Sequence, residues 1–167
     1  VEVLGFVDGH TSVDWIHATG CRVINLLCKG SLKHCSCQLK KLPEEHIEDI
    51  LAVVDYANVQ DMEVNVYLED WSNGMKDSPE YVFQLMDALI RTNIKRYMLP
   101  DTLGVLNQLQ VIEFMRKMVK RYPHAHFDFH AHNDYDLAVS NVLAAVLSGC
   151  KGLHTTINGL GERAGNA

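Results

Sequence analysis

The sequence alternates six times between strand-like and helix-like segments, and this alternation limits the fold more than any other feature. The strand-like segments, rich in Val, Leu, Ile and aromatic residues, cover residues 1–7, 22–27, 64–69, 96–101, 126–134 and 152–158. A turn at residues 8–12 leads into a short predicted helix that ends at Gly20. Further helices are predicted over residues 43–54, 78–91, 107–121 and 136–148, and residues 29–42 are expected to form a polar loop. Short connections between alternating strands and helices predict an α/β fold with a parallel sheet, either open and doubly wound or closed into a barrel.

The side chains within the strands favour the barrel. In residues 64–69, Val64, Val66 and Leu68 fall on one face, and Asn65, Tyr67 and Glu69 on the other. An open sheet covered by helices on both sides would have two apolar faces, whereas a barrel has an apolar outer face and an inner face that holds the reaction site. A TIM (β/α)8 barrel needs eight strands and typically ~250 residues. We therefore expect a partial TIM barrel with six of the eight strand-helix units, in which residues 1–167 are a fragment of one catalytic domain that lacks the first two strands and the last helix.

Composition excludes several classes of protein. The 167 residues carry a formal net charge of -6 without any basic run, which argues against nucleic acid or an anionic membrane as a partner. No apolar stretch approaches the ~18 residues of a membrane span, and no signal peptide is recognisable, so we expect a cytoplasmic protein. The five cysteines are scattered and odd in number, which predicts reduced thiols. Residues 34–37 (His-Cys-Ser-Cys) lack the second pair of a zinc knuckle and are predicted to lie in the loop.

Two histidines in the fifth strand-like segment suggest a metal site. His130 and His132 are separated by one residue, so on a strand they share one face with His126 and Asp128, while Phe127 and Phe129 take the other. Two positions along a strand span roughly 6.6 Å, close enough for both imidazoles to reach one ion at ~2.1 Å. A lone histidine on a strand is more often a hydrogen-bonded core residue, so the neighbouring polar clusters decide between the two readings.

Polar residues end four consecutive strands, at the rim where barrel enzymes place their reaction sites. They are Glu69 and Asp70, Asp101 and Thr102, residues 130–134, and the glycine-rich segment 158–166. Taken singly, Glu69 could be an ordinary rim carboxylate, and residues 101–104 could be a plain turn into the next helix. Together they predict a reaction site.

Three motifs resemble those of the DRE-TIM metallolyases, the HMGL-like family of metal-dependent acyl-CoA condensing barrels. They are residues 130–134 (His-Ala-His-Asn-Asp), 99–104 (Leu-Pro-Asp-Thr-Leu-Gly) and 158–166 (Asn-Gly-Leu-Gly-Glu-Arg-Ala-Gly-Asn). The resemblance covers all 167 residues. The family includes isopropylmalate, homocitrate and citramalate synthases and hydroxymethylglutaryl-CoA lyase. Residues 4–9, 25–31 and 66–74 are most similar to bacterial citramalate synthases. The family often has Gly where Ala131 stands and Leu-Gly where Tyr135 and Asp136 stand; these departures leave the ligands untouched.

The resemblance assigns a role to each matching position. His130 and His132 would bind a divalent Zn²⁺, Mn²⁺ or Mg²⁺ ion, with Asn166 as a weaker oxygen contact. Glu69 matches the acidic residue near the reacting methyl group, and Thr102 matches the hydroxyl that hydrogen-bonds the 2-oxo acid carboxylate. Leu4, Leu27 and Tyr67 match the walls of the pocket for the 2-oxo acid side chain. The family's Asp-Gly metal strand and its essential Arg are absent from these residues, so we expect the fragment alone to be inactive.

The implied reaction is a metal-assisted Claisen condensation of acetyl-CoA with a 2-oxo acid, followed by thioester hydrolysis. Bulky Leu4 and Leu27 favour pyruvate, giving citramalate for isoleucine biosynthesis, because each misfit group in such a pocket costs ~1 to 3 kcal/mol. The alternatives are 2-isopropylmalate synthase, homocitrate synthase and, more distantly, a hydroxyacyl-CoA lyase. A non-catalytic metal-binding barrel is the alternative outside enzymes. The expected partners are the small 2-oxo acid and acetyl-CoA, and the resemblance implies a homodimer for the full-length protein.

Overall fold

The computed structural model describes residues 1–167 and contains one six-stranded parallel sheet. Its strands lie in chain order: β1 (Val3–Phe6), β2 (Val23–Lys29), β3 (Glu63–Glu69), β4 (Tyr97–Asp101), β5 (Phe127–Ala131) and β6 (Gly152–His154). Each strand pairs in parallel with the next one along the chain. Strands β1 and β6 are therefore the two margins of the sheet.

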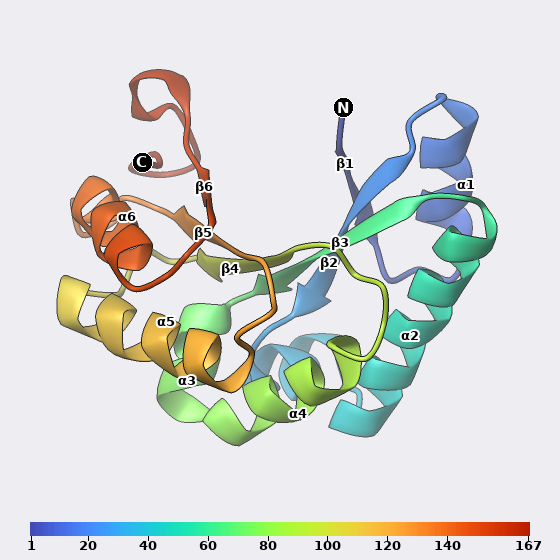
Figure 1. The fold of residues 1–167 in the computed structure, drawn as a ribbon, viewed down its shortest axis with the longest axis horizontal. Coiled ribbons are helices and arrows are strands. Elements are labelled where there is room, and N and C mark those ends of the chain that lie inside the picture. The colour runs from blue at the N-terminus through green and yellow to red at the C-terminus, as the bar shows by residue number, and fades with distance from the viewer.

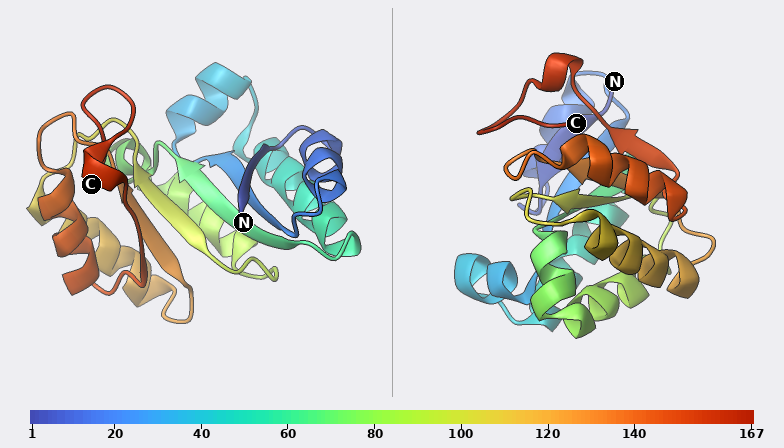
Figure 2. Two further views of the ribbon diagram at one scale, coloured as in Figure 1. Left: turned by 90° about the horizontal axis from the view of Figure 1, so that it is seen from above. Right: turned by 90° about the vertical axis from the view of Figure 1, so that its left-hand side faces the viewer.

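The helices lie on one side of a curved sheet. They are α1 (Thr11–Ala18), α2 (Pro43–Val59), α3 (Trp71–Asp77), α4 (Pro79–Leu89), α5 (Gln108–Arg121) and α6 (Ala138–Leu147). Figure 1 shows them around the convex side, with β1 and β6 rising at opposite margins, and Figure 2 shows the same curvature from two further directions. A doubly wound sheet would carry helices on both faces. The arrangement is that of a partial barrel, as the alternating strand pattern predicted.

The two faces of the sheet differ in the way the sequence predicted. On the outer face, Leu26 of β2 and Val66 and Leu68 of β3 are fully buried against the helices. Burying an aliphatic side chain of this size contributes about 1.5–3 kcal/mol, so this layer holds the sheet and helices together. On the inner face, the parallel register sets Leu27 beside Tyr67 and, one row nearer the strand ends, Lys29 beside Glu69.

The prediction of a polar loop at residues 29–42 was wrong in its centre. Residues His34–Leu39 form a short π-helix, η1, which Lys40 ends in the left-handed conformation at φ 55°. Within η1 only Cys35 is buried, so the segment has no apolar periodicity from which a helix could be predicted. The His-Cys-Ser-Cys motif at residues 34–37 therefore lies within this helix and not in a loop.

The structure differs from the sequence-based prediction at two further places, the segment after β3 and the end of β6. Helix α3 was not predicted; it begins directly after Asp70, which adopts the left-handed conformation, and a Cβ at Gly74 would lie 2.0 Å from the Gly30 carbonyl oxygen. The sixth strand was predicted to reach residue 158 but ends at His154, and a 3-10 turn, η2 (Ile157–Gly159), follows. The chain then returns, and Asn166 forms an antiparallel bridge with His132.

The cysteines and the helices bear on two exclusions made from composition. All five cysteines are free thiols, consistent with the predicted reduced state. None of the helices combines the length and apolarity needed to cross a lipid bilayer.

A buried histidine on α2 predicts how stability depends on pH. His46 is 1% exposed, and its Nε2 accepts a hydrogen bond from the backbone N–H of Lys29 at 3.0 Å. Burial lowers the pKa of His46 from 6.5 to about 4. Between these values the unfolded chain binds a proton that the folded chain excludes, so stability is complete above pH 6.5 and falls as the pH drops towards 4. The loss amounts to about 3 kcal/mol.

Urea unfolding of the wild type and of His46→Gln at pH 7 and pH 4.5 measures this contribution. The glutamine oxygen can still accept from Lys29, but the side chain does not titrate. We expect the wild type to lose more unfolding free energy than the variant over this interval. Equal losses in the two proteins would contradict the burial of a neutral His46.

Candidate active site

The carboxyl ends of the strands surround a pocket of about 370 Å³. Seven of the eight side chains for which the sequence predicted a role line it: Leu4, Leu27, Tyr67, Glu69, Thr102, His130 and His132. Pro100 and Glu162 complete the wall, and Asn166 contacts His130 from the side. Residues from five strands or strand ends thus meet at one place, as expected for the catalytic rim of a barrel.

The two histidine rings converge on one point. His130 lies on β5 and His132 directly follows it, and their Nε2 atoms are 3.2 Å apart. Two ligands at about 2.1 Å from one cation would be separated by roughly 3.0–3.4 Å in octahedral or tetrahedral geometry. The observed separation therefore fits two nitrogens that share one metal ion.

The protonation of both rings also suits a metal ligand, which must be a neutral imidazole. Burial is the main cause that lowers the pKa of His130 to about 4, and the neighbouring His132 and His154 add to the effect. Burial also lowers the pKa of His132, with a further contribution from the positive charge of Arg163. At neutral pH His130 thus offers a ring-nitrogen lone pair without first losing a proton.

Asn166 supplies the third polar group at this point. It is 8% exposed, and its Nδ2 lies 3.1 Å from His130 Nε2. Rotating the amide by 180° presents Oδ1 to the same position, so the side chain can serve as an oxygen ligand. The chain brings together no group of three His, Cys, Asp or Glu side chains that could hold a metal. Two imidazoles and one amide fit a divalent cation and leave its other positions to further ligands.

Glu69 faces the same pocket from the end of β3. Its carboxylate pairs with the Lys29 ammonium on β2, and both side chains are largely buried. The ion pair fixes the direction of the carboxylate. Lys29 has no role among the sequence-based predictions, although it lies two residues after Leu27 on the same face of the strand and therefore points to the same rim.

The Thr102 hydroxyl is prepared to donate a hydrogen bond. Its Oγ1 accepts from the backbone N–H of Asp70 at 2.9 Å, which leaves the hydroxyl proton free. The Asp70 backbone adopts φ 65°, and its 1% exposed side chain holds this conformation by hydrogen bonds to Ser31 and Asn73. The sequence placed Asp70 only among the polar residues at the strand ends; in the structure its backbone N–H positions Thr102.

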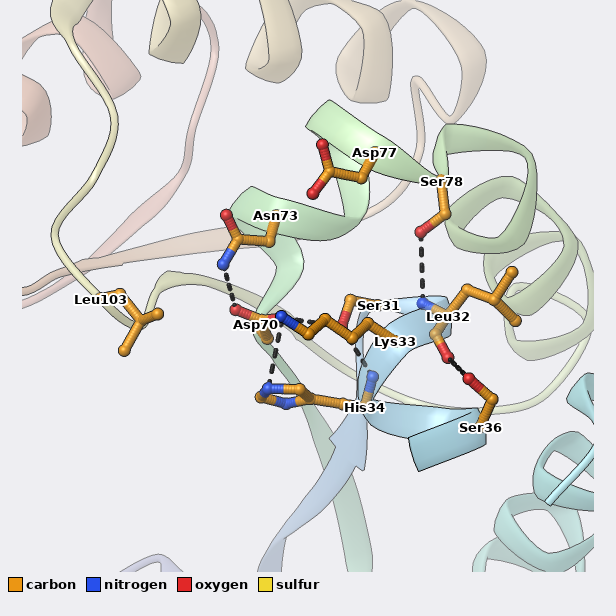
Figure 3. A pocket seen from close by; sticks show the side chains of 10 residues that line it. All are labelled: Ser31, Leu32, Lys33, His34, Ser36, Asp70, Asn73, Asp77, Ser78 and Leu103. Atoms are coloured by element: carbon orange, nitrogen blue, oxygen red, sulfur yellow. Dashed lines mark hydrogen bonds and ion pairs between the residues drawn. The ribbon is translucent and has the colours of Figure 1, made fainter. Parts of the chain in front are cut away.

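A second, more polar pocket lies beside Asp70, the residue that follows Glu69. It measures about 420 Å³ and lies between the start of η1 and helix α3. Figure 3 shows the Asp70 carboxylate at its wall, bonded to Asn73, Ser31 and His34, with Lys33 alongside. None of the side chains with a predicted catalytic role lines it, so the 370 Å³ pocket is the candidate reaction site.

The glycine-rich segment is fastened over the strand ends by Arg163. Its guanidinium holds Asp134 through Nε at 2.7 Å and Nη2 at 2.9 Å, and Nη2 also donates to the carbonyl of Thr102 at 2.8 Å. Gly104 packs closely against this region, and a side chain there has no room, because its Cβ would be 2.7 Å from the Asp134 nitrogen. Arg163 thus ties the ends of β4 and β5 to the segment that carries Asn166. The motif at residues 158–166 did not by itself predict a separate role for Arg163.

Comparison with known proteins identifies relatives of this arrangement. The model of the HMGL-like family matches residues 8–167. An (R)-citramalate synthase of Aquifex aeolicus is 36% identical over 145 residues, which cover 87% of this chain and 28% of that protein. A 2-isopropylmalate synthase of Saccharolobus solfataricus is 32% identical over 169 residues, covering 100% of this chain and 43% of that protein. The chain therefore spans less than half the length of these synthases.

A solved structure supports the fold independently. An HMG-CoA lyase of Bacillus subtilis superposes with a TM-score of 0.85 at 21% identity, over 98% of this chain and 58% of that one. At this identity the likeness concerns the fold, and it agrees with a partial TIM barrel. Together with the family match over nearly the whole chain, it shows that the chain belongs to the HMGL-like, or DRE-TIM metallolyase, family.

Proposed function

We propose that the protein is an acyltransferase that condenses acetyl-CoA with a small 2-oxo acid, pyruvate, to give citramalate. One observation carries the proposal: a single pocket brings the paired imidazoles, a carboxylate and a free hydroxyl together beside an apolar wall. These are the groups that the condensation needs. The similarity to a citramalate synthase and to a 2-isopropylmalate synthase supports the same class.

The residues of the pocket divide the work of the reaction. Thr102 donates its hydroxyl proton to the carboxylate of the 2-oxo acid and so orients the ketone. Glu69 removes a proton from the acetyl methyl group, and the resulting carbon attacks C2 of the 2-oxo acid. A C–C bond forms and the ketone electron pair moves onto its oxygen, which takes up a proton. Water then cleaves the thioester, releasing CoA as the thiol and leaving a new carboxylate.

A divalent cation held by His130, His132 and Asn166 would supply Lewis-acid polarisation of the ketone and charge for the oxygen that becomes negative. Membership of the HMGL-like family and the similarity to a citramalate synthase support a divalent metal and acetyl-CoA at the level of the family. Imidazole nitrogen with oxygen donors accommodates Zn²⁺, Mn²⁺ or Mg²⁺, and the donor set does not select among them.

The apolar wall supports pyruvate as the 2-oxo acid. Leu27 and Tyr67 are neighbours in the strand register, and Leu4 faces them from β1. A methyl group fits beside these side chains, whereas the isopropyl group of ketoisovalerate would overpack them. The runners-up are 2-isopropylmalate synthase, homocitrate synthase and a hydroxyacyl-CoA lyase that would use the same site in reverse.

Turnover of the full-length protein separates these possibilities. The protein is incubated with acetyl-CoA and pyruvate, ketoisovalerate or 2-oxoglutarate in turn, and release of the CoA thiol is followed. We expect pyruvate to give the highest kcat/KM. Preferential turnover of ketoisovalerate or 2-oxoglutarate rejects the pyruvate assignment. Cleavage of a hydroxyacyl-CoA without any condensation rejects the transferase.

Replacing Leu27 by Ala is expected to widen the pocket towards larger 2-oxo acids. Removing the side chain relieves a misfit of ~1 to 3 kcal/mol, so the ratio of kcat/KM for ketoisovalerate to that for pyruvate should rise roughly 10- to 100-fold. Leu39→Ala is a matched control, because Leu39 lies on η1 and does not line the pocket. An unchanged ratio in Leu27→Ala would remove the argument from pocket size.

We also propose that this chain forms part of one catalytic barrel domain completed by further strand-helix units. The two margins of the sheet carry large apolar side chains that are open to solvent. Phe6 and Trp15 are 53% and 73% exposed beside β1, and Leu143 and Leu147 are 59% and 72% exposed on α6. Two added strands would close the barrel between β6 and β1, and the one that carries the family's Asp-Gly pair would supply the remaining metal ligand.

A further inference from the structure

A chain of hydrogen-bonding groups leads from the metal-binding histidines into the interior of the barrel. Tyr67 Oη lies 3.1 Å from His130 Nδ1 and also bonds the Nδ1 of His154. His154 Nε2 in turn lies 3.3 Å from Asp128 Oδ2. All four side chains project from the inner face of β3, β5 and β6, where the register pairs His130 directly with His154.

The chemistry of these groups allows one consistent direction for the protons. The Asp128 carboxylate can only accept a hydrogen bond, so the facing Nε2 of His154 carries the ring proton and its Nδ1 is an acceptor. Tyr67 then donates its hydroxyl proton to the Nδ1 of His154. The Tyr67 oxygen in turn accepts from His130 Nδ1–H, which leaves the lone pair of His130 on Nε2. Every donor in this series of hydrogen-bonded groups meets an acceptor.

Asp128, the last group in this hydrogen-bonded series, is held in place by burial and by a positively charged neighbour. Asp128 is 1% exposed, and its Oδ2 also accepts from Arg96 Nη1 at 3.1 Å. On the adjacent strand stands Gly152, where a Cβ would lie only 2.1 Å from Asp128 Oδ1. A residue with a side chain at position 152 would displace the carboxylate. The sequence around β6 thus keeps room for Asp128.

We propose that Tyr67, His154 and Asp128 act as a positioning relay for His130. The relay holds the His130 ring with its proton on Nδ1 and its Nε2 lone pair directed at the cation. Outer groups of this kind orient a histidine ligand and typically change metal affinity 10- to 100-fold. The inference rests on the proposed role of His130 as a ligand, and it gives His154 and Asp128 a function that sequence reasoning did not assign.

Two measurements on the full-length protein test the relay without any use of turnover. In the metal-free protein, the ¹⁵N chemical shifts of the imidazoles report the tautomer of each ring. We expect His130 to be protonated on Nδ1 and His154 on Nε2. In His154→Leu the preference of His130 should weaken. Protonation of wild-type His130 on Nε2, or no change in its tautomer in His154→Leu, would overturn the proposal.

The second measurement is the affinity for Zn²⁺ and for Mn²⁺ by titration calorimetry. His154→Leu is expected to weaken binding roughly 10- to 100-fold, and His154→Asn, whose oxygen can still accept from Tyr67, should restore much of it. Thr155→Ala controls for disturbance of β6, because Thr155 is exposed and adjacent in sequence. Equal affinity in the wild type and His154→Leu would contradict the relay, as would equal losses in the Leu and Asn variants.

A double-mutant cycle separates a relay from a merely structural contact. If His154 acts through Tyr67, then His154→Leu should weaken metal binding little further once Tyr67→Phe is present. Full additivity of the two losses would show that His154 acts by another route. The protein could bind metal and show coupling between His154 and Tyr67, yet condense no 2-oxo acid. That result would reject the proposed function and leave the relay intact, so the two failures are distinguishable.

Discussion

Replacing His130 or His132 by Ala in the full-length protein is expected to abolish stoichiometric binding of a divalent metal and to reduce kcat by roughly 1000-fold or more. Each ring supplies one of two Nε2 atoms that lie 3.2 Å apart, and the nearby His154 directs its Nδ1 at Tyr67 and its Nε2 at Asp128. Loss of Lewis-acid stabilisation removes several kcal/mol from the transition state, and every 1.36 kcal/mol corresponds to a tenfold change in rate.

Titration calorimetry and initial rates measured over a range of metal concentrations test this expectation. His124→Ala is the matched control, because His124 is exposed in the turn before β5 and should leave both quantities unchanged. A variant that lacks either ring but still binds one metal ion with the affinity of the wild type would contradict the assignment of His130 and His132 as ligands.

Glu69→Gln is expected to lower kcat by roughly 100- to 10,000-fold while metal binding persists. The glutamine keeps the size of the side chain, but it cannot accept the methyl proton, and loss of a general base has effects of this size. KM for the 2-oxo acid should change little, because Thr102, and not Glu69, is the proposed partner of its carboxylate.

The readouts for this second change are kcat, KM and the exchange of acetyl-CoA methyl protons with deuterium. Glu63→Gln on the same strand is the control, since Glu63 is exposed at the opposite end of β3. Thermal unfolding of both variants measures any effect of leaving Lys29 without its partner. A kcat within a few-fold of the wild type would remove Glu69 from the role of base.

Much of the fold was predictable because buried faces of strands and helices require apolar residues at regular intervals in the sequence. Val64, Val66 and Leu68 alternate with polar residues, and this pattern was sufficient to predict an outer and an inner face. Helix α3 and the π-helix η1 left no comparable pattern. Helix α3 depends on the left-handed Asp70 and on close contact between Gly74 and Gly30, which are tertiary features.

The site was predictable to a similar extent, and for a related reason. Side chains at the carboxyl ends of parallel strands must lie near one rim, which brought Glu69, Thr102 and His130 to one pocket. Contacts between strands depend on register and curvature, which the sequence does not state. The pairing of Lys29 with Glu69 and the clamp of Arg163 on Asp134 emerged only from the structure.

X-ray absorption at the zinc edge of the Zn²⁺-loaded full-length protein tests the metal site most directly. Two imidazole groups with nitrogen at about 2.0–2.1 Å from the metal are expected in the wild type. Both should disappear from the spectrum of the His130→Ala, His132→Ala double variant. A wild-type spectrum without imidazole scattering, or one that the double substitution leaves unchanged, would contradict the central claim that these two rings hold the catalytic cation.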